Sequence, residues 1–223
     1  MIDVEKVRSR VQEILNEGNK FCCLVRDAVF QKEHSQKLRA YKAELSQMKE
    51  SCVDDENSAN EILALELMIE AQANELDMWV ALKDGLPADA WEHLISAQDA
   101  ARGAVRAHEM AHNLGAYQQK LNMAEKILFP PQLFFSMSVV VRESICSICN
   151  SSYGECDHIV GRAYFGKFCS RIITKAEARE VSIVDDPANK RCRMLEITDG
   201  GITRDFFTWR PIPRKTSEGK DTH

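Results

Sequence analysis

The chain has 223 residues, of which 44% are hydrophobic and 28% charged, so it can bury one large core or two smaller ones. Its 29 basic and 34 acidic side chains give a net charge of −5, and the residues from 146 onward carry 13 basic and 11 acidic side chains. This weak basic bias does not predict nucleic-acid binding, which usually comes with a strongly basic face.

The N-terminal residues Met1 to Glu5 lack the basic and apolar regions of a secretory signal. The longest apolar runs, such as Val139 to Val141, are too short to span a bilayer. We therefore expect a cytoplasmic protein without a membrane partner. In that compartment thiols stay reduced, and clustered cysteines favour metal binding over disulfides.

Residues 1–128 predict a helical domain. A first helix is expected to begin after an N-cap at Asp3 and to end at Gly18, because its apolar residues recur at helical spacing. An amphipathic pattern then continues from about Lys20 to Glu50. A third helix is expected after a capping box formed by Ser58 and Glu61, and it should end at Asp84-Gly85.

The second and third helices are joined by a short polar loop, which predicts an antiparallel helical hairpin over residues 20–83. Each arm should be roughly 40 Å long at about 1.5 Å per residue. Its apolar stripe resembles that of a coiled coil and is a candidate surface for a protein partner or for homo-oligomerisation. The alternative is that the hairpin packs onto the helices expected between residues 87 and 128.

A last helix is predicted from Gly103 to Leu128, before Pro130-Pro131, and it contains the motif His108-Glu109-Met110-Ala111-His112. In zincin metallopeptidases, H-E-x-x-H places two zinc-binding imidazoles on one helical face, with the Glu as general base. Here the third-ligand position of metzincins is Gln118, and no strands precede the helix. No catalytic residue is therefore favoured, and Glu109 with a second metal site at His108 and His112 is an alternative.

Residues 129–215 predict a β-rich domain that binds metal. A tetrahedral zinc needs four ligands, and a catalytic zinc keeps one position open, so a surplus of ligands favours a closed structural site. A redox C-x-x-C would follow a strand and open a helix in a thioredoxin-like unit, and that context is missing. Four of five side chains are expected to bind structural zinc, and the spacing does not choose among them: Cys146, Cys149, Cys156, His158 and Cys169.

Strands are expected around this cluster. The aromatic and β-branched run from Phe134 to Val141 predicts a strand leading into it, and short strands or turns are expected at 161–166 and 170–174. Another strand from Cys192 should turn at Asp199-Gly200-Gly201 and return up to Trp209. Residues 216–223 predict a flexible tail.

The stretch Glu180-Val-Ser-Ile-Val-Asp-Asp-Pro187-Ala-Asn189 resembles the E-V-S-L-V-x-x-P-A-N segment of phage prohead (maturation) proteases. The resemblance implies the barrel-like β-structure of that family, with Glu180 to Val184 as a strand that Pro187 ends, and a phage-related setting. It does not carry catalysis over. The family's nucleophilic Ser would fall within residues 161–166, which contain no Ser, and its catalytic His segment has no counterpart.

The sequence therefore predicts an α+β protein with a helical domain and a small zinc-stabilised β-rich domain. The function predicted first is that of a non-enzymatic zinc-binding interaction or adaptor protein. A zincin-type metallopeptidase and a nucleic-acid-binding zinc module are the alternatives. The second alternative would use a basic and aromatic face, made of Arg162, Tyr164, Phe165, Lys167, Arg171, Lys190, Arg191 and Arg193.

Overall fold

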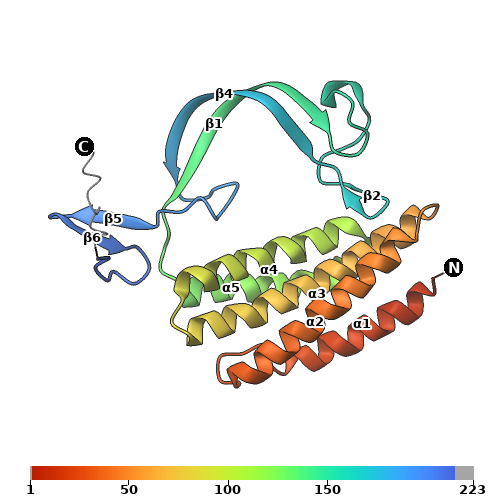
Figure 1. The fold of residues 1–223 in the computed structure, drawn as a ribbon, viewed down its shortest axis with the longest axis horizontal. Coiled ribbons are helices and arrows are strands. Elements are labelled where there is room, and N and C mark those ends of the chain that lie inside the picture. Colours follow the sequence, from red (N-terminus) through yellow and green to blue (C-terminus); the bar gives the residue numbers. More distant parts are fainter. Residues whose placement is uncertain (1, 214–223) are drawn as a thin grey trace, which may run out of the picture.

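A computed structural model describes residues 2–213 and shows helices followed by small antiparallel sheets (Figure 1), so the α+β class is confirmed. The helices are α1 (Val4–Asn19), α2 (Ala28–Glu50), α3 (Glu56–Lys83), α4 (Pro87–Ala107) and α5 (Gly115–Leu128), with short 3-10 segments η1 (Glu109–Leu114) and η2 (Tyr153–Glu155). The strands are β1 (Phe134–Cys146), β2 (Ala163–Tyr164), β3 (Lys167–Phe168), β4 (Arg171–Val184), β5 (Glu196–Asp199) and β6 (Ile202–Asp205).

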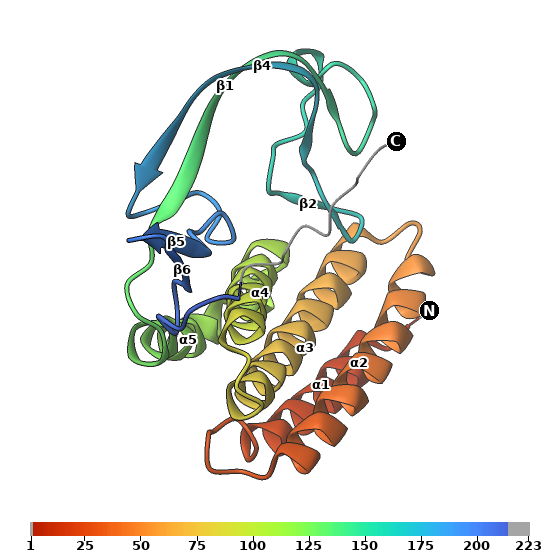
Figure 2. The same cartoon turned by 60° about the vertical axis from the view of Figure 1, so that its left-hand side comes forward.

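Helix α3 is the central element of the helical layer, with α1 and α2 on one side of it and α4 on the other (Figure 2). Its side chains are buried around most of its circumference, including Leu65, Leu76 and Met78. The expected hairpin of α2 and α3 is present, but its inner arm is enclosed by α1 and α4. The hairpin therefore packs onto its neighbours, and only the outer side of α2 remains exposed.

The N-cap predicted at Asp3 is confirmed, because its carboxylate accepts a hydrogen bond from the Lys6 amide at 3.1 Å. The start predicted for the second helix at Lys20 is wrong, since α2 begins at Ala28. The Asp27 carboxylate accepts from the Val29 amide at 2.7 Å and so fixes the beginning of this helix.

The capping box predicted at Ser58 and Glu61 is not formed. Helix α3 begins three residues earlier, with Asp55 as its N-cap, whose carboxylate accepts from the Ser58 amide at 3.0 Å. Glu61 instead lies on the inner face of α3 and forms an ion pair of 2.6 Å with Arg8 of α1. Glu61 therefore forms a tertiary ion pair instead of the capping interaction that the local sequence pattern predicted.

Strands β1 and β4 form a long antiparallel ribbon that arches over the helical layer and approaches it at its two ends (Figures 1 and 2). Strand β4 is one element of 14 residues where the sequence indicated separate short strands at 170–174 and 180–184. It ends at Val184, and Pro187 lies in the bend that follows. All sheets among the described residues are two-stranded, so the barrel implied by the prohead-protease resemblance is not formed.

The base of the ribbon is fixed by an aromatic cluster shared between helices and strands. The Trp91 ring of α4 lies 5.3 Å from Phe129, 6.2 Å from Phe134 and 5.8 Å from Phe207, measured between centroids. The Trp91 indole also donates to the Lys190 carbonyl at 3.1 Å. The two halves of the chain therefore share one core at this end of the molecule.

The predicted C-terminal hairpin is present as β5 and β6, with Gly200 and Gly201 at φ values of 55° and 80°. Both values suit a type I′ turn. The return strand ends at Asp205 and not at Trp209. The tail predicted at 216–223 lies outside the described residues. Within residues 2–213, no helix combines the length and the apolar character needed to cross a membrane.

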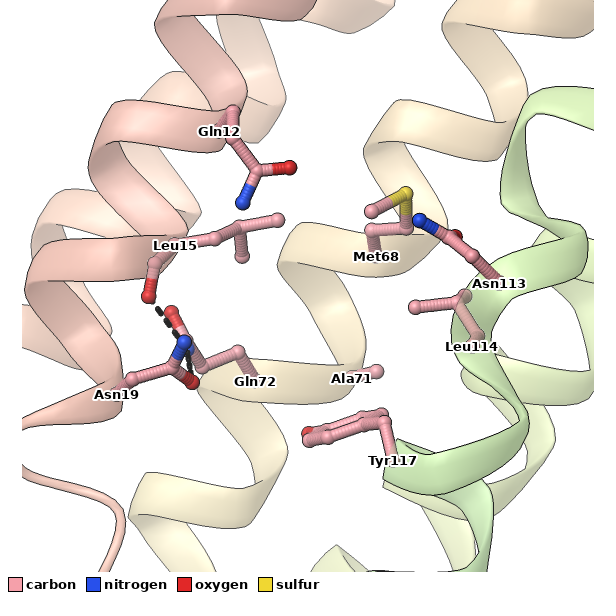
Figure 3. A pocket seen from close by; sticks show the side chains of 9 residues that line it. All are labelled: Gln12, Leu15, Asn19, Met68, Ala71, Gln72, Asn113, Leu114 and Tyr117. Carbon is pink, nitrogen blue, oxygen red and sulfur yellow. Dashed lines mark hydrogen bonds between the residues drawn. The ribbon is translucent and has the colours of Figure 1, made fainter.

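Helix α1 does not end at Gly18 as predicted but at Asn19. Gly18 lies where α1 packs against α2 and α3. A Cβ atom here would lie 2.2 Å from Gln72 Oε1 and 2.6 Å from His34 Nε2. The Gln72 side chain is held in place, since its amide donates to the Leu15 carbonyl at 2.9 Å and to Asn19 at 3.0 Å (Figure 3).

We expect Gly18→Ala to lower the free energy of unfolding by about 1–3 kcal/mol, because the added methyl group overpacks this contact. Gly115→Ala is the matched control, since Gly115 begins α5 and a Cβ there meets nothing within 4 Å. That variant should change stability by less than about 1 kcal/mol. Urea unfolding monitored by circular dichroism measures both, and equal stabilities would contradict the packing argument.

Candidate metal centre

The predicted cysteine and histidine cluster forms at the tip of the ribbon, in the loop between β1 and β4. The ligand atoms of Cys146, Cys149, Cys156 and His158 all lie within 4.8 Å of one another. In the part of the chain that the structure describes, this is the one group of three or more Cys, His, Asp or Glu side chains close enough to hold a metal ion. The cluster can therefore bind a metal.

The Cys146-x-x-Cys149 segment forms a tight knuckle at the end of β1. The Asn150 amide donates to the Cys146 carbonyl at 2.9 Å, and the Ile148 amide points to the Cys146 sulfur at 3.4 Å. Asn150 has a left-handed backbone with φ of 58°, which turns the chain back. Amides aimed at a sulfur stabilise its thiolate, as in the outer shell of metal sites.

Cys169 lies next to this cluster, at the far end of the loop. Its sulfur is buried and lies 3.7 Å from the Cys146 sulfur. Two thiolates on a tetrahedral zinc with bonds of about 2.3 Å are about 3.8 Å apart, so this distance suits two ligands of one ion. Four of the five predicted side chains thus form one group, and Cys169 lies beside it, against Cys146.

The imidazole of His158 has the surroundings of a ligand. Its Nδ1 atom is buried and has no hydrogen-bond partner among the described residues. A buried polar atom without a partner is costly, and metal coordination would satisfy it. The ring is held edge-on by Tyr164 at 4.7 Å, and the Tyr164 hydroxyl accepts from the Ile159 amide at 3.0 Å.

The pKa values of the two knuckle thiols, Cys146 and Cys149, are lowered, whereas those of Cys156 and Cys169 are raised. Burial opposes ionisation of Cys146, but hydrogen bonds from the amides of Cys149 and Ile148 outweigh it and lower its pKa to about 7. The amide of Ser151, with its side chain, lowers the pKa of Cys149. Burial and the nearby Cys146 raise the pKa of Cys169 to about 11. A bound cation would favour the thiolate at every ligand.

The Cys156 thiol shows a balance of opposing effects. The His158 amide favours its thiolate, yet burial and the neighbouring Cys146 and Cys149 thiols outweigh this and raise its pKa. Without a cation, a charge on one sulfur therefore suppresses a charge on the next. A metal ion that binds several of these sulfurs at once removes this conflict.

The same loop carries the turn that docks the tip on the helices. Strands β2 and β3 lie between His158 and Cys169, and Ala163 of β2 is buried against α3 and α4. The Asn60 side chain of α3 accepts from the Gly166 amide at 2.8 Å and donates to the Ala163 carbonyl at 3.4 Å. The ribbon is therefore fastened at its tip by a turn bounded on both sides by candidate ligands.

The helix predicted from Gly103 to Leu128 is wrong, and with it the basis of the H-E-x-x-H site. Helix α4 ends at Ala107, and His108 is extended, with φ of −157°. The His108 ring accepts from the Met110 amide through Nδ1 and contacts Asn57 at 3.2 Å through Nε2. His112 follows in the 3-10 segment η1. At about three residues per turn, positions i and i+4 do not share a face.

The basic and aromatic side chains proposed for nucleic acid do not form one face. Arg162, Lys167 and Arg171 lie at the tip of the ribbon, whereas the residues from Lys190 to Arg193 lie at its base. Arg191 is paired with Asp99 at 2.7 Å and with Glu92 at 3.2 Å, and Lys190 with Glu125 at 2.7 Å. Arg193 is buried and stacks on Phe207 at 3.9 Å. Most of the basal charges are thus neutralised within the chain.

The remaining cysteines stand apart from the metal centre. Cys22 is buried in the core of α1, α2 and α3, as expected for a small apolar residue. Cys23 and Cys52 are partly buried and lie in the helical half. Cys192 is exposed at the base of the ribbon, where its carbonyl accepts from the Phe135 amide at 2.7 Å.

The sequence did not reveal the docking turn as a functional element. Its signal was Gly166, which follows a left-handed Phe165 in a two-residue turn, with φ values of 73° and 44°. The partner Asn60 lies 106 residues earlier and carried no signal of its own.

No protein-family model, curated protein or solved structure matches this chain in comparisons with known proteins. The resemblance to phage prohead proteases therefore stays a prediction based on residues 180–189.

We expect Gly166→Ala to loosen the tip, because a Cβ there would lie 2.7 Å from the Lys49 side chain and 3.3 Å from the Ala59 carbonyl, on a left-handed backbone. Amide exchange of residues 163–168 should accelerate by at least about tenfold, an opening cost of about 1.4 kcal/mol. Gly154→Ala in the same loop is the control, since nothing lies within 4 Å of its Cβ position. Equal exchange in both variants would contradict the docking.

Proposed function

We propose that the protein is a non-enzymatic zinc-binding interaction protein, in which structural zinc holds the tip of the β1–β4 ribbon on the helical layer. The observation that carries this proposal is the gathering of Cys146, Cys149, Cys156 and His158 within 4.8 Å of one another, with the Cys169 sulfur 3.7 Å from that of Cys146. A set of thiolates with one imidazole matches the ligand preference of zinc.

A structural role is supported by the surplus of ligands. A catalytic zinc keeps one position for water or substrate, whereas here four candidate ligands lie together and a further thiol, Cys169, lies 3.7 Å from the Cys146 sulfur. The loop of residues 147–170 also contributes few side chains to the hydrophobic core; Ala163 and Cys169 are its buried apolar members. Small loop-rich segments of this kind usually need a metal to stay folded.

An interaction role follows from what the zinc would hold in place. The ribbon contacts the helical layer at its base and through the turn at its tip, and its strands are otherwise largely exposed. Zinc would thus fix the position of a long exposed surface without taking part in a reaction. This moves the partner surface from the helical hairpin, whose inner arm is enclosed, to the ribbon.

We expect one zinc per chain in the purified protein, measured by elemental analysis. Cys146→Ser/Cys149→Ser should lose the metal, because two knuckle ligands are gone, and amide exchange of residues 163–168 should rise as the tip is released. His108→Ala/His112→Ala is the control, and it should keep its zinc because these imidazoles do not share a helical face. Zinc-free wild type, or a cysteine variant that retains the metal, would overturn the proposal.

A further inference from the structure

The two faces of the β1–β4 ribbon differ in polarity. Residues directly opposite each other in an antiparallel pair point to the same side, and neighbours along a strand alternate. Phe135 pairs with Ile183, and Met137 pairs with Val181. The side chains between these pairs, Ser136 and Ser182, belong to the other face. One side of the ribbon base is therefore apolar and the other is polar.

Irregularities in the pairing keep the apolar residues on one side. The register shifts between Ser138 and Val139, so that Val139 pairs with Ala178 and Arg179 has no direct partner. Without this shift, Ala178 and Ala176 would lie on the polar side of the ribbon. The extra residue in β4 moves them to the side of Phe135 and Met137. Two further shifts follow towards the tip. Alternation also places Arg179, two residues from Val181, on this side, whose apolar residues are Phe135, Met137, Val139, Val141, Ile173, Ala176, Ala178, Val181 and Ile183.

The apolar face points away from the helical layer at the base of the ribbon. Phe134 and Val184 belong to the opposite face, and both pack against the core around Trp91. Their neighbours Phe135 and Ile183 must then point outward, and they are exposed, Ile183 to 61%. Met137 and Val181 follow them with exposures of 63% and 62%. At its base the ribbon thus packs the Phe134 and Val184 side against the helices and turns the side of Phe135 and Ile183 to solvent.

An isolated two-stranded ribbon is at best marginally stable in water, and a third layer or further strands are needed to cover its apolar face. No described residue covers Met137, Val181 or Ile183. Arg179 is the charged side chain that alternation places on this face, and it lies 3.9 Å from Glu177. A largely apolar strip offers few contacts to nucleic acid and suits another apolar surface.

We propose that a second copy of the chain covers this face, so that two ribbons stack through their apolar sides about a twofold axis. Both faces are then identical and self-complementary, and sheets stacked face to face lie about 10 Å apart. The proposal deepens the proposed function, because it names the partner that the zinc-held ribbon binds.

The size of the face predicts a weak dimer. Strand β4 has 14 residues and is therefore about 45 Å long, and two strands are about 10 Å wide, so the face covers about 450 Å². Two copies would bury about 900 Å², near the lower limit of specific interfaces. We therefore expect reversible association in the micromolar range.

Charges on the ribbon do not oppose this pairing. The two strands carry four cations and three carboxylates, which leaves a single net charge although the whole chain has −5. Several are neutralised within the ribbon: Arg142 is bound to Glu177 at 2.9 Å, and Lys175 lies 3.4 Å from Glu143. Two copies can therefore approach through the ribbons while the acidic helical parts stay apart.

Val181→Glu and its neighbour Ser182→Glu provide a matched test, because both positions are exposed and lie on opposite faces of β4. Sedimentation velocity of the full chain, over about 1–500 μM, measures dimer dissociation. Wild type should dimerise, and Val181→Glu should weaken the dimer at least about 30-fold because it buries a charge in the apolar contact. Ser182→Glu should change the dissociation constant less than about threefold, since its side chain faces the other way.

A wild type that stays monomeric at about 500 μM would overturn the inference, and so would equal weakening by the two variants. Zinc content is measured on the same samples. Zinc-loaded wild type that does not dimerise overturns this inference and leaves the metal site standing. Zinc-free wild type that dimerises through Val181 supports this inference and overturns the proposed function.

Discussion

The structure depends on one constraint: a ribbon of two strands cannot hold its own position in space. Neither β1 nor β4 has a third strand beside it, and neither is covered along its length, so the ribbon must be fixed at its ends. The base is fixed by apolar packing, where Trp91 contacts Phe129, Phe134 and Phe207. Among the described residues the tip has no comparable aromatic cluster, and the candidate metal ligands Cys146, Cys149, Cys156 and His158 lie there. In the proposed function, metal binding would fasten the tip as apolar packing fastens the base.

This division explains why the candidate ligands are spaced as they are. Cys146 ends β1, and Cys169 comes two residues before β4. An ion bound to both would therefore link the two ends of the loop where it leaves the strands. Residues 159–168, between the candidate ligands His158 and Cys169, contain no candidate ligand and form the turn that binds Asn60. Metal binding would therefore be coupled to docking: ordering the ligands would also order the turn, and an ordered turn loses less conformational entropy when it binds α3.

Sequence reasoning succeeded where the information was local. The Asp3 cap, the glycine turn of the C-terminal hairpin and the ligand spacing each depend on a few consecutive residues. It failed where distant residues compete for a side chain. Glu61 left the predicted cap for Arg8, and His108 left the predicted helix to contact Asn57 and to cap η1. The pairing of β1 with β4 was also not predicted, because β4 is exposed on both faces and interrupted by bulges and so gives no clean alternation along its 14 residues.

The bulges made the ribbon difficult to predict from the sequence, and they also account for its curvature and for the different polarity of its two faces. Each one adds local twist and bend, which lets the two strands arch from the Trp91 cluster to the tip. Each also shifts the alternation by one residue, and together the shifts keep Val139, Ala178 and Ile173 on the side that begins with Phe135 and Ile183. A regular ribbon with this sequence would place Ala178 and Ala176 on the polar side and break the apolar strip. The curvature of the ribbon and the gathering of its apolar residues on one side therefore have a common origin in the bulges.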